Sequence, residues 1–148
     1  SPLGKVLEER FGAPIRMLSE WDALDVRLAS TPVPNQNGGV MRAWVRTQDA
    51  LPDDPFLHAA ILAYLTDLLL LSVSTVQHEV EFLSPNLQTA SIDHAMWFHR
   101  PARCDQWLLY DMISPSASGA RGFCQGRLFQ DGKLVASCAQ EGLIRLLG

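Results

Sequence analysis

The feature that most constrains the fold of this chain is the segment Pro55–Ser74, which is apolar on almost every side of a helix. A helix that is hydrophobic all round is a buried helix, so we expect the remainder of the chain to wrap around it. Asp53 and Asp54 suit the capping position before this helix, and Pro55 suits its first turn.

One carboxylate, Asp67, interrupts this apolar helix near its centre. Burying a carboxylate is costly unless it is hydrogen-bonded, and the helix contains no Lys or Arg that would pair with it. Two interpretations remain open. Asp67 either shares a narrow exposed stripe with Thr66, or it is held in the interior for chemistry.

Composition narrows the class of protein. A chain of 148 residues that is 47% hydrophobic forms one domain with a substantial core. The formal net charge is -4 and the basic residues form no run, which argues against nucleic acid as a partner. Polar residues inside the helix and the lack of Lys or Arg at its ends argue against a membrane span. The three cysteines have no CxxC spacing, which argues against a metal site or a disulfide framework and favours a cytoplasmic location.

The remaining segments are predicted to be mostly strands. Residues 1–20 are expected to form a linker or approach segment, and residues 21–148 a single domain. The predicted strands are Trp21–Ala29, Val40–Thr47, Thr89–His99, Gln106–Ile113, Gly119–Phe129 and Lys133–Leu146. This order is an α+β pattern. A curled antiparallel sheet of about six strands around one long buried helix is the hotdog fold.

The last predicted hairpin allows a choice of register. A two-residue turn at Asp131 and Gly132 would place Gln125 and Arg127 on the apolar face. A three-residue loop, Gln130–Gly132, separates apolar from polar side chains better, so we prefer it. The small apolar face is then made of Gly122, Cys124, Gly126, Leu128, Leu134, Ala136 and Cys138. Gln140 continues this face and points at the helix; alternatively, it caps an open strand end.

Several sequence blocks carry a family resemblance. They are SIDHAMWFHRP (Ser91–Pro101), WLLY (Trp107–Tyr110), SPSASGARGF (Ser114–Phe123), DGKLVASCAQEGLIR (Asp131–Arg145) and AYLTDLLLL (Ala63–Leu71). In this order they closely resemble acyl-CoA thioesterase II. That family is built as a double hotdog, and this sequence looks like its second domain without the first.

The resemblance implies three water-activating residues, Asp67, Ser91 and Gln140. Ser91 stands where the family has Thr, which keeps the hydroxyl but leaves its orientation less fixed. Strict alternation places Ser91 on the face opposite Met96. Either a bulge near the start of this strand, or a concave side lined by Ala95 and Trp97 instead, would bring Ser91 to the helix.

Other residues are candidates for a functional role, but each also has a simpler structural explanation. The side chains of Arg100, Arg103 and Arg121 suit the phosphates of coenzyme A, although isolated surface arginines are commoner. His94 and His99 would face opposite sides of a strand, so a shared metal or catalytic site there is disfavoured. No metal or cofactor is expected. The serines between Ser114 and Ser118 lack a nucleophile elbow and are expected in a turn or bulge.

The resemblance implies hydrolysis of a fatty acyl-CoA to free acid and coenzyme A, with Asp67 activating water. An alternative is a non-catalytic half that binds acyl chains or supplies an assembly surface and needs the missing N-terminal domain. A third possibility, a hotdog dehydratase acting on hydroxyacyl thioesters, is favoured only by the fold. Since a single hotdog exposes a sheet edge and a helix flank, we expect a homodimer or pairing with an N-terminal hotdog domain.

Overall fold

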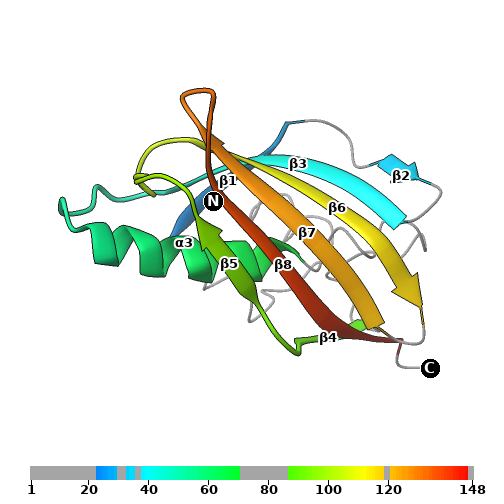
Figure 1. Ribbon diagram of the computed structural model, residues 1–148. Coiled ribbons are helices and arrows are strands. Elements are labelled where there is room, and N and C mark those ends of the chain that lie inside the picture. Colours follow the sequence, from blue (N-terminus) through cyan, green and yellow to red (C-terminus); the bar gives the residue numbers. More distant parts are fainter. Residues whose placement is uncertain (1–22, 30–32, 36–37, 71–86, 119–120, 147–148) are drawn as a thin grey trace, which may run out of the picture.

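The computed structural model describes residues 23–29, 33–35, 38–70, 87–118 and 121–146 (Figure 1). The single helix of this part of the chain is α3, Pro55–Leu70. The strands are β1 Leu24–Leu28, β2 Val33–Asn35, β3 Gly38–Thr47, β4 Leu87–Ser91, β5 Ala95–Phe98, β6 Leu108–Ser118, β7 Arg121–Gln130 and β8 Lys133–Leu146. They form one eight-stranded antiparallel sheet in the order β1-β3-β6-β7-β8-β4, with β2 paired to β3 and β5 paired to β8.

The α+β architecture predicted from the sequence is confirmed. Figure 1 shows a curved sheet with α3 lying against one of its faces. The core forms between them from alternate residues of the strands and one side of the helix. Its helix members are Leu62, Leu65, Leu69 and Leu70, and its sheet members include Val26, Val45, Tyr110, Leu128 and Ala136. No helix among the described residues is long and apolar enough to cross a membrane.

The expectation that the chain wraps α3 on every side is wrong for the residues that the structure describes. Leu65 is fully buried, whereas Phe56 is 87% exposed and Tyr64 is 49% exposed. Together with exposed Ala60 they follow an i, i+4, i+8 spacing, which is one stripe of the helix. The sheet therefore covers one side of α3 and leaves an apolar stripe on the other.

The predicted third strand is interrupted, which is why the sheet has more strands than expected. Residues 92–94 leave the ladder and divide the segment into β4 and β5, both of which pair with β8. Residues 33–35, which lie between the first two predicted strands, form the additional short strand β2. β6 continues past Ile113 to Ser118 through an irregularity between Ile113 and Ser116, so the bulge expected near these serines is confirmed.

The turn of the last hairpin has two residues, so the predicted three-residue loop is wrong. Gln130 pairs with Lys133, and Asp131 and Gly132 both have positive φ, at 51° and 75°. A register shift then occurs, because Phe129 pairs with Leu134 while Leu128 pairs with Ala136. The extra residue on β8 restores the predicted buried face from Ala136 onward, whereas Leu134, which was predicted on that face, is half-buried and pairs with Phe129.

Gly126 of β7 allows a close approach of neighbouring side chains on this buried face. A Cβ atom at Gly126 would lie 2.7 Å from the Tyr110 ring and 2.9 Å from the sulfur of Cys138. Only glycine fits at this point of the strand without a shift of the buried tyrosine.

Candidate active site

The structure brings together the three residues that the resemblance implies, from three different elements. The Ser91 hydroxyl, at the end of β4, donates a hydrogen bond of 2.7 Å to Oδ1 of Asp67 on α3. The side-chain amide of Gln140, on β8, donates to the Ser91 oxygen at 3.3 Å. Asp67 is half-buried, whereas its neighbour Thr66 is fully buried, so the exposed-stripe interpretation fails for Thr66.

Ser91 reaches the helix because of a bulge, the first of the two explanations considered above. The backbone amides of Ile92 and Asp93 both point to the carbonyl of Glu141, at 2.9 and 3.4 Å. Ser91 pairs with Gly142 but Ala95 pairs with Ala139, so the β4–β5 segment carries one extra residue relative to β8. This extra residue turns Ser91 to the same side as Met96.

The side chain of Asp93 fixes this bulge. Its Oδ1 accepts a hydrogen bond of 2.7 Å from the backbone amide of Glu141. The Ile-Asp-His and Gln-Glu-Gly segments, which lie far apart in the sequence, therefore hold one another in register across the sheet.

Gln140 faces the interior, as its place on the small apolar face predicted. It is 1% exposed and lies on a strand that has neighbours on both sides, so it does not cap an open edge. Its side-chain oxygen lies 2.5 Å from Nδ1 of His94, and Nε2 of His94 lies 2.9 Å from the Thr66 hydroxyl.

His94 is the residue of this cluster that sequence reasoning missed. Because the strand was expected to be unbroken, His94 was considered only together with His99. The two histidines do have different partners in the structure. His99 lies 3.0 Å from the Ser137 hydroxyl instead. Among the described residues no group of His, Cys, Asp and Glu side chains is arranged to hold a metal ion. The spacing between Ser91 and His94, read with a bulge between them, is the signal that points to His94.

Tyr110 on β6 anchors the helix beneath the cluster. Its hydroxyl donates to the carbonyl oxygen of Thr66 at 2.9 Å. Burial raises the pKa of Tyr110 well above its usual value of 10.0, so the phenol is a fixed hydrogen-bond donor.

The cysteines are structural. Cys104, Cys124 and Cys138 are buried thiols. Burial raises the pKa of Cys104 from 9.0 to about 12 and also raises that of Cys138. Both therefore stay as thiols at neutral pH and are poor nucleophiles.

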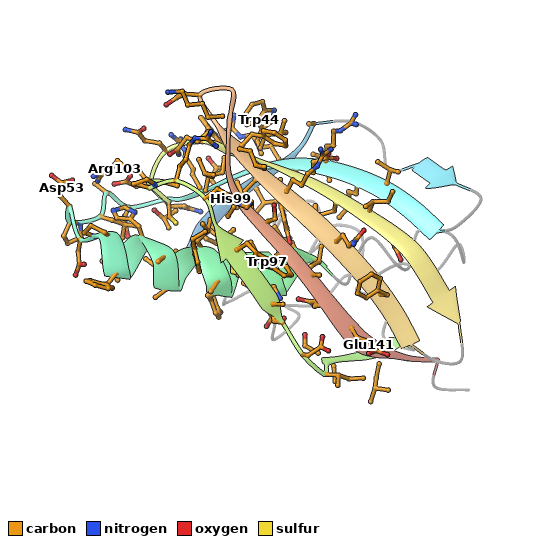
Figure 2. All side chains as sticks on the ribbon, viewed as in Figure 1. Trp44, Asp53, Trp97, His99, Arg103 and Glu141 are labelled. Carbon is orange, nitrogen blue, oxygen red and sulfur yellow. The ribbon has the colours of Figure 1, made fainter. Side chains whose placement is uncertain are left out.

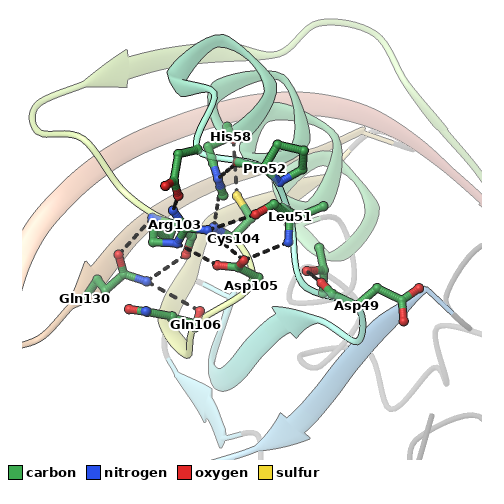
Figure 3. Close-up of polar contacts among 11 residues, drawn as sticks. Asp49, Leu51, Pro52, His58, Arg103, Cys104, Asp105, Gln106 and Gln130 are labelled. Carbon is green, nitrogen blue, oxygen red and sulfur yellow. Dashed lines mark hydrogen bonds and ion pairs between the residues drawn. The ribbon is translucent and has the colours of Figure 1, made fainter.

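Arg103, a candidate for phosphate binding, belongs to a polar clamp at the N-terminal end of α3 (Figure 3). Its guanidinium pairs with Asp105 at 2.9 Å and with Asp53, and it donates to the Leu51 carbonyl at 3.0 Å. Figure 2 shows Arg103 and Asp53 side by side at this end of the helix. The charge of Arg103 is thus already balanced by two carboxylates.

Arg100 is placed differently. It donates to the carbonyl of Leu134 at 2.6 Å and forms no ion pair within the described part of the chain. It lines a cleft of about 280 Å³ between the first turns of α3 and the end of β5, whose other walls include Leu62 and Phe98. The backbone of Arg121 begins β7, but its side chain lies outside the described residues.

The imidazole ring of His58 is buried and hydrogen-bonds backbone groups at the N-terminal end of α3. Its Nδ1 accepts a hydrogen bond of 3.0 Å from the Cys104 amide. Its Nε2 lies 2.9 Å from the carbonyl of Pro52, to which it must donate. Both ring nitrogens are used by backbone groups, so His58 serves structure rather than chemistry.

Comparison with known proteins identifies the family of the chain. Residues 18–143 match the profile of the acyl-CoA thioesterase family. The chain is 42% identical over 109 residues to human acyl-coenzyme A thioesterase 8, covering 70% of this chain and 32% of that protein. It is 40% identical over 104 residues to acyl-CoA thioesterase 2 of Haemophilus influenzae, covering 70% and 36%.

Solved structures give the same result. An acyl-CoA thioesterase II from Mycobacterium marinum is 44% identical, with a TM-score of 0.76, over 86% of this chain and 51% of that one. A thioesterase from Haemophilus influenzae shares the fold at 11% identity, with a TM-score of 0.64. The chain spans about a third of the length of the curated relatives it matches. It belongs to the acyl-CoA thioesterase family and has its hotdog fold.

Proposed function

We propose that this chain is a thioesterase domain that hydrolyses fatty acyl-CoA to free fatty acid and coenzyme A, with Asp67 as the general base. The observation that carries the proposal is the convergence of Asp67, Ser91 and Gln140 from α3, β4 and β8. Membership of a family whose relatives are named acyl-CoA thioesterases supports it.

The chemistry requires a water directed at the thioester carbonyl and a group that takes its proton. Among the described residues only Ser91 hydrogen-bonds the Asp67 carboxylate, through Oδ1. The other oxygen is therefore available to a water molecule. Gln140 uses one amide hydrogen on Ser91 and retains a second, which is suited to hold the same water. Water then adds to the carbonyl carbon, its proton passes to Asp67, and the coenzyme A thiolate leaves.

The test is release of free thiol from a long-chain acyl-CoA by the wild-type chain and by Asp67→Asn. Positioned base catalysis contributes on the order of 10²–10⁴-fold, so the variant should lose activity by at least that order. Asp49→Asn, an exposed carboxylate outside the site, is the matched control and should keep full activity. A loss of less than about threefold in Asp67→Asn would exclude Asp67 as the base.

For the substrate, we assign Arg100 as the arginine best placed to meet a phosphate of coenzyme A. It lines an apolar cleft and carries no carboxylate partner among the described residues, in contrast to Arg103. Roles for Arg103 and Arg121 stay as predictions, as do the linker at residues 1–20 and the cytoplasmic location.

Because the chain spans about a third of its relatives' length, a second function stays in view. It would be a non-catalytic acyl-binding or assembly half that needs a first hotdog domain. If neither the wild type nor Asp67→Asn releases thiol, supplying that domain decides between the two functions. We also propose that the domain pairs with a second hotdog, either another copy or an N-terminal domain, through the exposed stripe of α3.

A further inference from the structure

We propose that His94 is a positioning residue of this site, whose Nδ1–H fixes the side-chain amide of Gln140 so that it donates to Ser91. The inference rests on the proposed function only for its catalytic consequence. The series of hydrogen bonds from His94 through Gln140 and Ser91 to Asp67, here called the relay, follows from the contacts of these side chains alone.

The direction of the relay starts at the carboxylate. An ionised Asp67 can only accept, so the 2.7 Å contact requires the Ser91 hydroxyl to donate its one hydrogen to Asp67. The Ser91 oxygen is then an acceptor toward Gln140. The group of Gln140 that faces Ser91 at 3.3 Å must therefore be the amide nitrogen.

The remaining atom of the amide defines the state of His94. With its nitrogen toward Ser91, Gln140 turns its oxygen to His94, at 2.5 Å from Nδ1. A carbonyl oxygen can only accept, so Nδ1 must carry a hydrogen. Each donor in the series from His94 to Gln140 to Ser91 consequently points toward Asp67.

Thr66 completes the series on the other side of the imidazole. Its hydroxyl lies 2.9 Å from Nε2 of His94 and 2.9 Å from the carbonyl of Ala63. When His94 is neutral, the hydroxyl donates to Nε2. When His94 is protonated, Nε2 donates to the hydroxyl, which then turns to Ala63. Nδ1 carries a hydrogen in both states.

Without the Nδ1 donor, the amide of Gln140 loses the contact that sets its orientation. A rotated amide would present its oxygen to Ser91, and the Ser91 hydrogen would have two competing acceptors. Ser91 would then hold the Asp67 carboxylate less firmly. Small misplacements of a base and its water cost up to about 10²-fold in rate, so His94 should affect kcat rather than binding.

The first measurement uses no substrate. In the ¹⁵N-labelled chain at neutral pH, the ring-nitrogen chemical shifts should show a protonated Nδ1 on His94. The side-chain amide signals of Gln140 should move in His94→Leu and stay close to their wild-type positions in His94→Asn. Asn places an amide nitrogen on Cγ, as histidine places Nδ1, whereas Leu has a similar shape and no donor. An unprotonated Nδ1 would reverse the relay and overturn the proposal.

The second measurement is steady-state hydrolysis of a long-chain acyl-CoA. His94→Leu should lower kcat on the order of 10- to 100-fold with little change in KM, and His94→Asn should recover most of that loss. Asp49→Asn, which changes an exposed carboxylate away from these contacts, is the control and should match the wild type.

The two measurements separate the two proposals. If Asp67→Asn is inactive and His94→Leu is fully active, the role of His94 is refuted while the hydrolytic function stands. If the wild type does not hydrolyse acyl-CoA, the proposed function fails, and the Gln140 amide signals alone decide whether His94 orients that side chain.

Discussion

At the scale of single residues, polar side chains satisfy the backbone where α3 begins. Asp105 is the centre of this arrangement. It accepts the amide of Leu51 at 2.8 Å and two hydrogen bonds from Arg103, at 3.0 and 2.9 Å. The hydrogen bonds from Arg103 and then that from Leu51 lower the pKa of Asp105 from 3.8 to about 2.

This shift predicts an acid-dependent stability. Because the folded pKa is depressed, the ionised carboxylate stabilises the fold fully above pH 3.8, and this contribution is lost as the pH falls toward about 2. Urea unfolding of the wild type and Asp105→Asn should show a difference in stability that is constant at neutral pH and shrinks through this window. Gln106→Asn, a neutral change in the same loop, should shift stability equally at every pH. A difference for Asp105→Asn that persisted unchanged down to pH 2 would contradict the prediction.

At the scale of elements, the bulge between β4 and β5 decides the geometry of the site. Without it, Ser91 and Met96 would face opposite sides of the sheet. The bulge depends on Asp93, whose carboxylate accepts the Glu141 amide. A regular strand without the bulge would contain the same residues but would turn Ser91 away from Asp67.

We therefore expect Asp93→Ala to loosen the bulge. Loss of this hydrogen bond should cost on the order of 1 kcal/mol of stability, and amide hydrogen exchange of Glu141 should accelerate. Activity should fall because Ser91 is no longer held against Asp67. Asp93→Asn retains a side-chain oxygen and should behave like the wild type in both measurements. Unchanged exchange of the Glu141 amide in Asp93→Ala would show that the carboxylate does not hold the bulge.

The same bulge marks how far the sequence could predict the structure. Alternating apolar residues predicted the strands and the buried face of β7 and β8, since period-two burial depends on local pattern. Asp67 and Gln140 were singled out from the residue pattern as well as by the family resemblance, whereas Ser91 came from the resemblance alone. The bulge near His94 was one of two explanations left open by the sequence, and the bulge at Val135 was not predicted, because the backbone at each bulge is hydrogen-bonded to a segment far away in the sequence. For that reason His94 was missed, and the buried face of β8 from Ala136 onward was predicted correctly from an incorrect turn.

At the scale of the whole molecule, the stripe formed by Phe56, Ala60 and Tyr64 on α3 is an exposed apolar surface of the described chain. Phe56 is 87% exposed, and an apolar surface of this kind usually marks an interaction site. Figure 1 shows α3 lying against one face of the curved sheet. The stripe is exposed whereas Leu65 on the same helix is fully buried, so the stripe lies on the side of α3 away from the core. A second hotdog seated there would complete the burial of a helix that is apolar on nearly every side.

Sedimentation of the isolated chain should therefore give twice the 16.4 kDa mass of the monomer. The double variant Phe56→Glu, Tyr64→Glu should sediment as a monomer, because two buried charges on the stripe would oppose pairing. Phe123→Glu, on the outer face of β7, is the matched control and should remain dimeric. A dimer that survives both changes on α3 would place the contact elsewhere on the molecule. A monomeric wild type would mean that the stripe is covered by a different hotdog domain and not by a second copy.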